Sequence, residues 1–324
     1  MRGVRPVVRV PFLEGGMTAS RSLWRGRLAL FATVIIWSSP PIFQYWLAAS
    51  FDAWTQNFYR SLAGFFVMAP FLLWMAWRAP RRIPAADWAG CALAALPNVV
   101  HQIAQTMAVV LLWPGVYALL GRLSVVFTAV LAMIFFADER WIARSWKFQA
   151  GTVFALIGVA GLVWAPGRGM SGAEPWIGLL LALAAALAWA LYGVLVKKFT
   201  LRSGPTLGFG VVSFLTTLLL LPGMLLFGDA TALLRVGAWA NFVLFASGVI
   251  SIGLGHWLYY IGIRDIGAAP SQAALLLCPL GTMLLSSALF GETFRFEQIF
   301  AGAVLLLGAF LALSARPPVI EEPA

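Results

Sequence analysis

Long runs of apolar residues, separated by short polar links, make up most of the chain. Each run holds roughly 20 residues, the length with which an α-helix crosses a bilayer. The runs are continuously apolar, whereas the strands of a membrane barrel alternate between apolar and polar positions. The pattern therefore predicts ten transmembrane helices, at about 28–49, 55–77, 88–112, 115–136, 147–165, 176–196, 206–227, 240–262, 268–290 and 298–314.

The pattern is repeated once along the chain. Trp37 and Trp189 lie 152 positions apart, and so do Pro70 and Pro222. Because each copy would hold an odd number of helices, the second copy enters the membrane from the opposite side. Inverted repeats are a recurrent plan of secondary transporters, whose substrate site lies near the midplane between the halves. The predicted fold is an all-α integral membrane protein, with ten transmembrane helices arranged as two inverted five-helix repeats around a central cavity.

The composition is that of a membrane protein, and the distribution of charge indicates on which side of the membrane the termini lie. The chain is 61% hydrophobic and 10% charged, against roughly 45–50% and about 25% for soluble domains. Of the 22 Lys and Arg residues, 17 fall on the side of the two termini, 3 on the opposite side and 2 inside helices. This positive-inside bias predicts cytoplasmic termini. The expected location is a bacterial inner membrane. The net charge of +10 is explained by this topology, so no nucleic-acid partner is expected.

The predicted organisation has four parts. They are a cytoplasmic N-terminal tail over 1–27, a first five-helix repeat over 28–166, a second, inverted repeat over 176–314, and a cytoplasmic C-terminal tail over 315–324. The two cysteines lie inside predicted helices and offer neither a disulfide framework nor metal spacing. A GxGxxG string at 167–172 lies in a loop without the strand and helix that a nucleotide site needs. Neither a cofactor nor a catalytic centre is expected.

The third predicted helix carries the clearest polar stripe. Asn98, His101, Gln102 and Gln105 follow the i, i+3, i+4, i+7 spacing of one helix face. Polar side chains inside a bilayer usually face protein or water, so this stripe is expected to line a cavity that hydrogen-bonds a polar solute. The alternative is that these side chains join packed helices. His256 occupies nearly the same place in the second repeat, where it lines the cavity or belongs to an interfacial aromatic belt.

Aromatic residues recur in the first helix of each repeat. Trp37 and Gln44 share a face in one, and Trp189 and Tyr192 share a face in the other. Buried indoles can stack on a planar or cationic solute, or they can simply fill the core. The prolines at 40–41 are expected to kink or loosen the first helix and to free backbone carbonyls, as in the broken helices beside transporter sites.

The remaining candidates come from three helices. The fourth predicted helix holds Tyr117, Arg122 and Ser124, and the ninth holds Gln272. Arg122 lies about 12 Å deep at 1.5 Å per residue, where it meets a substrate carboxylate or extends toward the membrane surface. It projects roughly 140° away from Tyr117, so both cannot point squarely into one narrow pore. Arg60, near the start of the second helix, is expected to extend toward the interface.

Acidic residues are missing from the helix interiors. All twelve lie in tails, loops or helix ends. No mid-membrane carboxylate is therefore predicted to relay protons or sodium ions. This favours passive, gradient-driven passage, although a relay through the histidines stays open.

The paired layout resembles the drug/metabolite transporter superfamily, specifically its ten-helix EamA type. The most specific segments are 135–140 (FFADER) after the fourth helix and 289–292 (LFGE) after the ninth. Both look like the Gly-Glu signature of that family, with Asp138 in place of the Gly in the first repeat. We expect Glu139 and Glu292 to cap the helices that follow them.

Within this family the chain is most similar to YddG-type exporters of aromatic amino acids, through Trp-Ser-Ser-Pro at 37–40, His101 and Trp189. The resemblance implies facilitative efflux of Phe, Tyr and Trp by alternating access, with the amino acid and the lipid bilayer as partners and no obligatory protein partner. Three alternatives stay open. One is a multidrug or planar-cation exporter, and another is a sugar-phosphate or nucleotide-sugar carrier with several basic cavity residues. The third is a non-transporting membrane receptor or enzyme.

Overall fold

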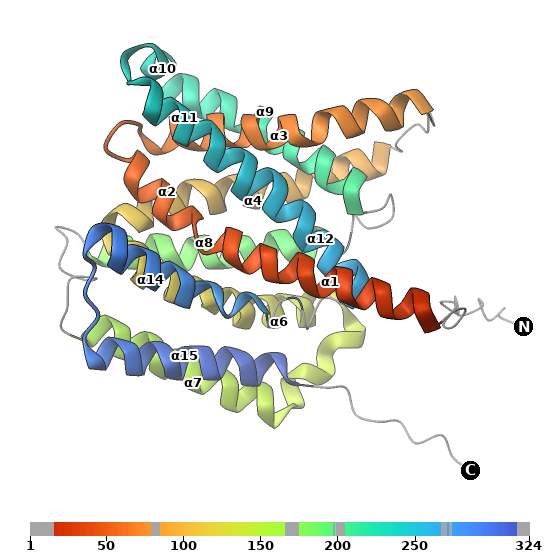
Figure 1. Ribbon diagram of the computed structural model, residues 1–324. Helices are drawn as coiled ribbons and strands as arrows, with labels where there is room; N and C mark the ends of the chain where they lie inside the picture. The colour runs from red at the N-terminus through yellow and green to blue at the C-terminus, as the bar shows by residue number, and fades with distance from the viewer. Residues whose placement is uncertain are drawn as a thin grey trace, which may run out of the picture.

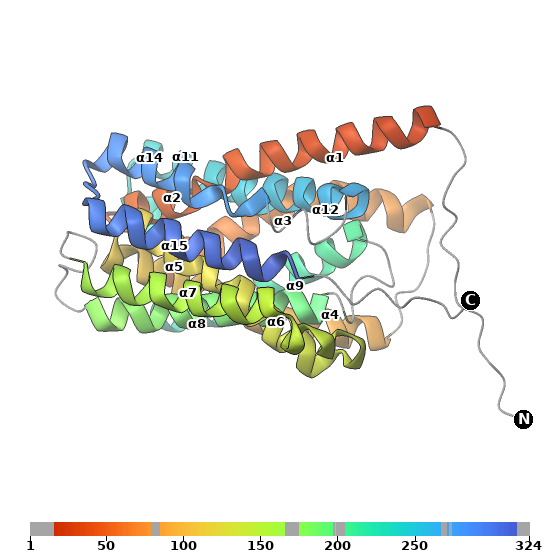
Figure 2. The same cartoon turned by 90° about the horizontal axis from the view of Figure 1, so that it is seen from below.

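The computed structural model describes residues 16–78, 85–165, 175–196, 198, 205–266, 271 and 274–315. Within these ranges the chain forms helices and no strands. The helices form one elongated bundle, and α1 begins and α15 ends toward the same end of it (Figures 1 and 2). The predicted all-α fold is confirmed.

The helices of the first half are α1 (Gly16–Trp37), α2 (Pro40–Leu47), α3 (Ala53–Arg78), α4 (Ala85–Leu112), α5 (Pro114–Leu120), η1 (Gly121–Leu123), α6 (Ser124–Phe135), η2 (Ala137–Arg144) and α7 (Trp146–Trp164). Those of the second half are α8 (Pro175–Leu195), α9 (Pro205–Phe227), α10 (Ala232–Arg235), α11 (Ala238–Ser247), η6 (Gly248–Leu254), α12 (Gly255–Ile266), α14 (Cys278–Phe290) and α15 (Phe296–Leu313). Among the described residues, 8 helices or joined helices are long and apolar enough to cross a membrane, and α14 is a shorter apolar helix. The count of ten stays a prediction.

Helix packing relates the two halves to each other. Helix α1 packs on α12, and α4 packs on α8. The first helix of each repeat therefore contacts the third helix of the other repeat. The second helices, α3 and α9, pack together, and so do the fifth helices, α7 and α15. This reciprocal pattern is what two structural repeats related by a pseudo-two-fold axis produce.

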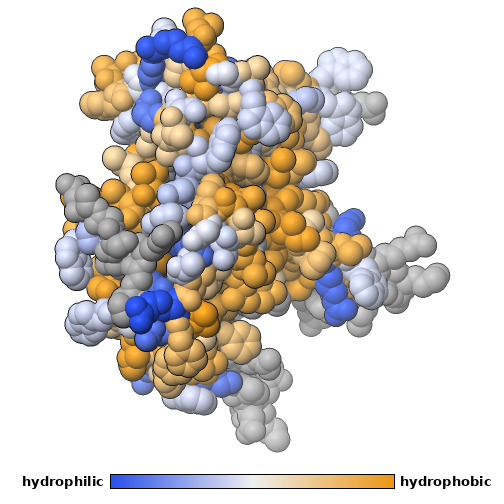
Figure 3. All heavy atoms as spheres, turned by 60° about the vertical axis from the view of Figure 1, so that its left-hand side comes forward, coloured by the Kyte–Doolittle hydropathy of each residue, from blue (hydrophilic) through white to orange (hydrophobic). Residues whose placement is uncertain are grey.

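The outer surface of the bundle is apolar. Large side chains such as Phe31, Phe66, Leu226 and Phe300 are exposed. Figure 3 shows a largely hydrophobic surface on which hydrophilic residues gather in a few patches. Apolar surface of this extent is unfavourable in water, so lipid is the solvent of this surface. The protein is a multi-pass membrane protein.

The first predicted span is broken, as its prolines predicted. Helix α1 ends at Trp37, and Pro40 begins α2 at a position where its missing N–H breaks no helical hydrogen bond. The hydroxyl of Thr282 donates to the carbonyl of Ser38 at 2.8 Å, and Ser38 Oγ donates to the carbonyl of Cys278 at 3.2 Å. Helix α14 of the second repeat therefore hydrogen-bonds to the segment between α1 and α2 of the first repeat.

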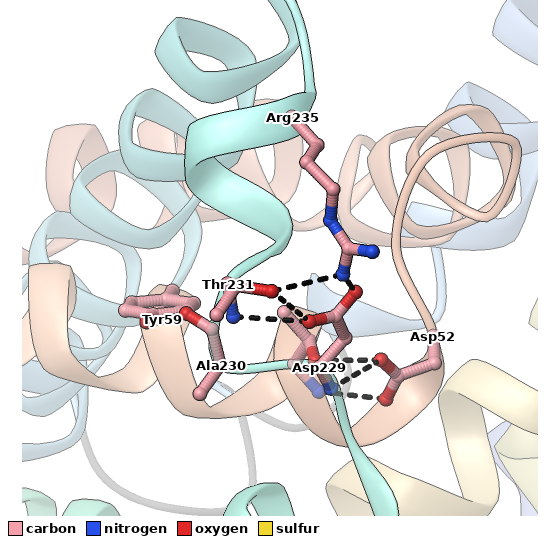
Figure 4. Close-up of polar contacts among 7 residues, drawn as sticks. Asp52, Tyr59, Asp229, Ala230, Thr231 and Arg235 are labelled. Atoms are coloured by element: carbon pink, nitrogen blue, oxygen red, sulfur yellow. Dashed lines mark hydrogen bonds and ion pairs between the residues drawn. The ribbon is translucent and has the colours of Figure 1, made fainter.

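A polar cluster joins the two repeats at one end of the bundle (Figure 4). Asp52 Oδ1 accepts hydrogen bonds from the backbone N–H groups of Trp54 and Thr55, at 2.8 and 2.9 Å, and so caps α3. The other carboxylate oxygen of Asp52 accepts from the N–H of Asp229 at 3.2 Å. Asp229 forms an ion pair with Arg235. One carboxylate thus orders the start of α3 and contacts the loop before α10.

Replacing Asp52 by Ala is expected to lower the free energy of unfolding by about 1 kcal/mol, the usual effect of removing an N-cap. Asp52→Asn is expected to keep most of the stability, because Asn caps a helix about as well as Asp. Thermal unfolding of the purified protein in detergent measures both variants. An equal loss in the two variants would show that the charge of Asp52, and not its capping hydrogen bonds, stabilises this end of the bundle.

Candidate functional site

A cavity lies between the two repeats and holds about 1090 Å³ of empty space, counting the part that is open to solvent. Its wall is made by both halves of the chain, as expected for a transporter built from inverted repeats. Most of the residues predicted from the sequence line it: Trp37, Gln44, Asn98, His101, Gln102, Gln105, Tyr117, Arg122, Ser124, Trp189 and His256.

Two predicted residues differ from these. Tyr192 is buried behind the wall, where its ring packs on Trp189 and its hydroxyl oxygen lies 3.3 Å from that of Tyr260. It supports Trp189 and does not line the cavity, because it follows Trp189 by three residues and turns toward α12. Gln272 lies outside the described residues.

The polar stripe of α4 both lines the cavity and joins helices, so the two interpretations are not exclusive. Asn98 donates to Thr216 Oγ1 on α9 at 3.1 Å. His101 Nδ1 lies 2.9 Å from the carbonyl oxygen of Ala185 on α8. A carbonyl only accepts, so Nδ1 is the donor, and in the neutral ring Nε2 is left as an acceptor. The interhelical bonds orient these side chains before a solute arrives.

An amide network continues the stripe toward α2 and α3. Gln105 Nε2 donates to Gln44 Oε1 at 2.8 Å, and Gln44 Nε2 donates to Thr106 Oγ1 at 2.9 Å. Ser61 Oγ donates to Gln102 Oε1 at 2.9 Å. Within the described part of the chain, Gln102 Nε2 and Gln105 Oε1 make no hydrogen bond. The cavity wall therefore offers an amide donor and an amide acceptor to a bound solute.

An aromatic cluster forms another part of the wall, and it repeats the internal symmetry. The ring centroids of His101 and Trp189 are 4.9 Å apart, and so are those of His256 and Trp37. The two indoles meet edge to face, with centroids 5.8 Å apart. Phe209 stacks on His256 at 5.2 Å. Each repeat thus supplies one histidine that packs on the tryptophan of the other repeat.

A π-helical segment, η6, holds Trp37 in this cluster. Trp37 Nε1 donates to the carbonyl of Ser251 at 3.0 Å. A Cβ on Gly255 would lie 2.4 Å from Nε1, so only glycine at this position lets the indole approach. Short π-helical segments occur often at functional sites, where they re-aim the backbone.

Tyr117 and Arg122 both reach the cavity, although they project from different sides of their helix. The cavity spreads from Gln44 on α2 to Cys278 on α14 and is not one narrow pore. Arg122 Nη1 donates to the carbonyl of Leu275 at 3.0 Å, and its Nε is buried without a partner in the described chain. Arg122 therefore does not extend to the membrane surface.

Arg60 corrects a prediction, because it is 2% exposed and lines the cavity instead of extending to the interface. Its Nε donates to Ser247 Oγ at 3.0 Å. Helix η6 covers it closely: a Cβ on Gly248 would lie 2.3 Å from the Arg60 carbonyl oxygen. The signal in the sequence was the Arg-Ser pair at 60–61 inside an apolar run.

Glu292 corrects a second expectation. Its Oε2 accepts hydrogen bonds from the N–H of Gly115, at 3.0 Å, and from the hydroxyl of Ser286. It therefore caps α5 of the first repeat, whereas α15, the helix that follows it, is capped at Arg295. Burial raises the pKa of Glu292 above its ordinary value. The side chain of Glu139 lies outside the described residues.

The model of the EamA-like transporter family matches residues 24–164 and 176–314. The chain belongs to the EamA-like transporter family. The two matched segments follow the two halves of the bundle, which agrees with the repeat seen in the helix packing.

This EamA-like transporter is similar to YyaM of Bacillus subtilis, described as an uncharacterized transporter, with 28% identity over 208 residues, 60% of this chain and 63% of that protein. An uncharacterized transporter of Methanothermobacter thermautotrophicus is 34% identical over 135 residues, 41% of this chain and 38% of that protein. The matches thus span between 38% and 63% of the length of these relatives.

A protein of known crystal structure shares the fold of this EamA-like transporter, with a TM-score of 0.63 and 20% sequence identity. The match covers 89% of this chain and 95% of the chain of that protein. The family and its transporter relatives indicate a membrane transporter and not an enzyme. The alternative of a membrane enzyme is therefore wrong.

Proposed function

We propose that this EamA-like transporter exports the aromatic amino acids Phe, Tyr and Trp across a bacterial inner membrane, with both termini in the cytoplasm. The observation that carries the proposal is the symmetric aromatic cluster of Trp37, Trp189, His101 and His256 in one cavity. Offset and edge-to-face packing on these rings would bind an aromatic side chain. The free amide groups of Gln102 and Gln105 would bind the polar end of the amino acid.

The charge of the wall disfavours the planar-cation alternative. Among the described residues that line the cavity, Arg60 and Arg122 are basic and none is acidic. A cation that left water for this cavity would lose hydration and meet two guanidinium groups without a counter-charge. A zwitterion with a carboxylate suits the same wall better.

The proposed mechanism is facilitative alternating access, in which the two repeats rock about the cavity. The break between α1 and α2 and the π-helical segment η6 lie at the cavity wall, and both are places where helices bend. No carboxylate belongs to the described wall, so tight coupling to protons would depend on the histidines alone.

A sugar-phosphate carrier is the second candidate, because Arg60 and Arg122 supply two basic groups where the sequence predicted one. Phosphate groups are bound well by guanidinium groups. The aromatic cluster gives this candidate less support, since a small phosphorylated sugar does not require several aromatic rings. Counterflow of a hexose phosphate in proteoliposomes that contain the purified protein tests this candidate.

Efflux of preloaded labelled Phe and Trp from proteoliposomes, without a proton gradient, tests the proposed function. We expect flux of Phe and Trp that discriminates against Ala, and a fall of about tenfold in Trp189→Leu, the effect of losing about 1.4 kcal/mol of ring packing. Trp164→Leu is the matched control, because Trp164 is 81% exposed on the lipid side of α7. Flux of planar cations in the absence of amino-acid flux would instead support the cation exporter.

A further inference from the structure

Arg60 is a buried cation whose charge is not neutralised within the described chain. It is 2% exposed, it lines the cavity, and the bond from its Nε to Ser247 Oγ is the one hydrogen bond that its guanidinium makes among the described residues. A guanidinium carries five N–H donors, so four are left. A charge that is buried without a partner is costly. The site is therefore suited to an anion that arrives and leaves with the solute.

Arg122 places a second cationic group at a similar depth. Arg60 lies seven residues into α3, and Arg122 lies eight residues beyond Pro114, the first residue of α5. Helix α4 runs antiparallel to α3 and ends just before α5 begins. Helices α3 and α5 therefore begin at the same end of the bundle. At 1.5 Å per residue, both arginines lie about 10–12 Å from that end.

The aromatic cluster lies deeper along the same axis. Trp37 is ten residues before Leu47, the last residue of α2, and Trp189 is fourteen residues after Pro175, the first residue of α8. The fourteen residues of α8 correspond to about 21 Å from the same end. Trp37 lies beyond the break between α1 and α2, and its ring centroid is 5.8 Å from that of Trp189. The cavity is thus cationic toward one end and aromatic farther in, which fits a solute with a carboxylate at one end and a ring at the other.

We propose that Arg60 is the anchor for the carboxylate of the solute, and that the transported class is aromatic carboxylates with or without an α-ammonium group. The inference rests on the proposed function, because it uses the same cavity as the substrate site. No acidic side chain in the described wall is available to pair with an ammonium group. Recognition therefore comes from the carboxylate, held by charge-assisted bonds, and from the ring.

Competition with labelled Phe in wild-type proteoliposomes separates the groups of the substrate. Unlabelled 3-phenylpropanoate lacks the ammonium group, whereas phenylalaninamide and 2-phenylethylamine lack the carboxylate. We expect 3-phenylpropanoate to inhibit within about threefold of Phe. The two compounds without a carboxylate are expected to inhibit about tenfold more weakly or worse, because they lose a hydrogen bond to a charged group.

Variants test the assignment to Arg60. Arg60→Gln is expected to lower Phe flux by about tenfold or more and to abolish the preference for Phe over phenylalaninamide. Arg60→Lys, which keeps the charge, is expected to restore part of the preference. Arg140→Gln is the matched control, since Arg140 is exposed in η2, outside the cavity. If Arg60→Gln does not fold, Arg60→Lys tests the assignment to this residue, and the competition series in the wild type tests the requirement for a carboxylate.

The outcomes distinguish the two proposals. Phe flux that phenylalaninamide inhibits as well as Phe does would overturn the carboxylate anchor and leave the proposed function standing. Phe flux that 3-phenylpropanoate does not inhibit would overturn the assignment of the substrate class to aromatic carboxylates without an α-ammonium group. Flux of 3-phenylpropanoate without flux of Phe would support this inference and overturn the amino-acid function, and flux of neither would overturn both.

Discussion

Gly308→Ala is expected to lower the free energy of unfolding by about 2–3 kcal/mol, because overpacking of a close helix contact forces backbone shifts. A Cβ on Gly308 would lie 2.4 Å from the amide nitrogen of Ala155 and 2.6 Å from the carbonyl oxygen of Gly151. Backbone atoms cannot rotate away as a side chain can, so α7 and α15 must separate. The two helices lie side by side in both views (Figures 1 and 2).

Gly193→Ala is the matched control, because the same substitution in α8 meets no heavy atom within 4 Å. Alanine in a helix interior is favoured over glycine by roughly 0.5–1 kcal/mol, so a small stabilisation is expected. Thermal unfolding of both variants in the same detergent measures the difference. A similar shift for the two substitutions would show that close packing of small residues does not hold α7 on α15.

Glu292→Ala is expected to destabilise the protein by about 2 kcal/mol or more, because it leaves buried donors without an acceptor. The N–H of Gly115 and the hydroxyl of Ser286 both donate to this carboxylate, which is 1% exposed. Glu292→Gln keeps an acceptor oxygen in the same place, so it is expected to retain most of the stability. Equal losses in the two variants, measured by thermal unfolding, would mean that the cap on α5 is not what Glu292 contributes.

The stability of the wild type relative to Glu292→Gln is also expected to depend on pH. Burial raises the pKa of Glu292 above its ordinary 4.5, so the folded protein binds more protons than the unfolded chain between the two values. The contribution of this group is fully present below that window and is lost as the pH rises through it. Thermal unfolding of the two proteins across a pH series checks the sign. A relative stability that increases with pH would show that the hydrogen bonds to the carboxylate outweigh its burial.

Several residues of the site were predictable because their signal is local. The stripe of Asn98, His101, Gln102 and Gln105 follows from helix periodicity inside an apolar run, and all four line the cavity. The break of the first span follows from its prolines, which no helix interior accepts without disruption. Neither inference requires knowledge of the neighbouring helices.

Other side chains were misplaced because their environment comes from distant parts of the chain. Arg60 lies near the start of α3, a position that predicts extension toward the interface, but η6 covers it and Ser247 Oγ accepts its hydrogen bond. Tyr192 shares a stretch with Trp189, but its hydroxyl meets Tyr260. Glu292 caps a helix of the other repeat and not its own neighbour.

The sequence by itself therefore determined the all-α membrane fold and the internal repeat, because the bilayer imposes length and apolarity on every span. Only the tertiary structure decided which polar groups share the cavity. Any face of a helix can be turned toward a neighbour, and the packing of α1 on α12 and of α4 on α8 decides which faces come together around the cavity. Those contacts join residues more than eighty positions apart, as His101 and Ala185 show, and no local pattern encodes them.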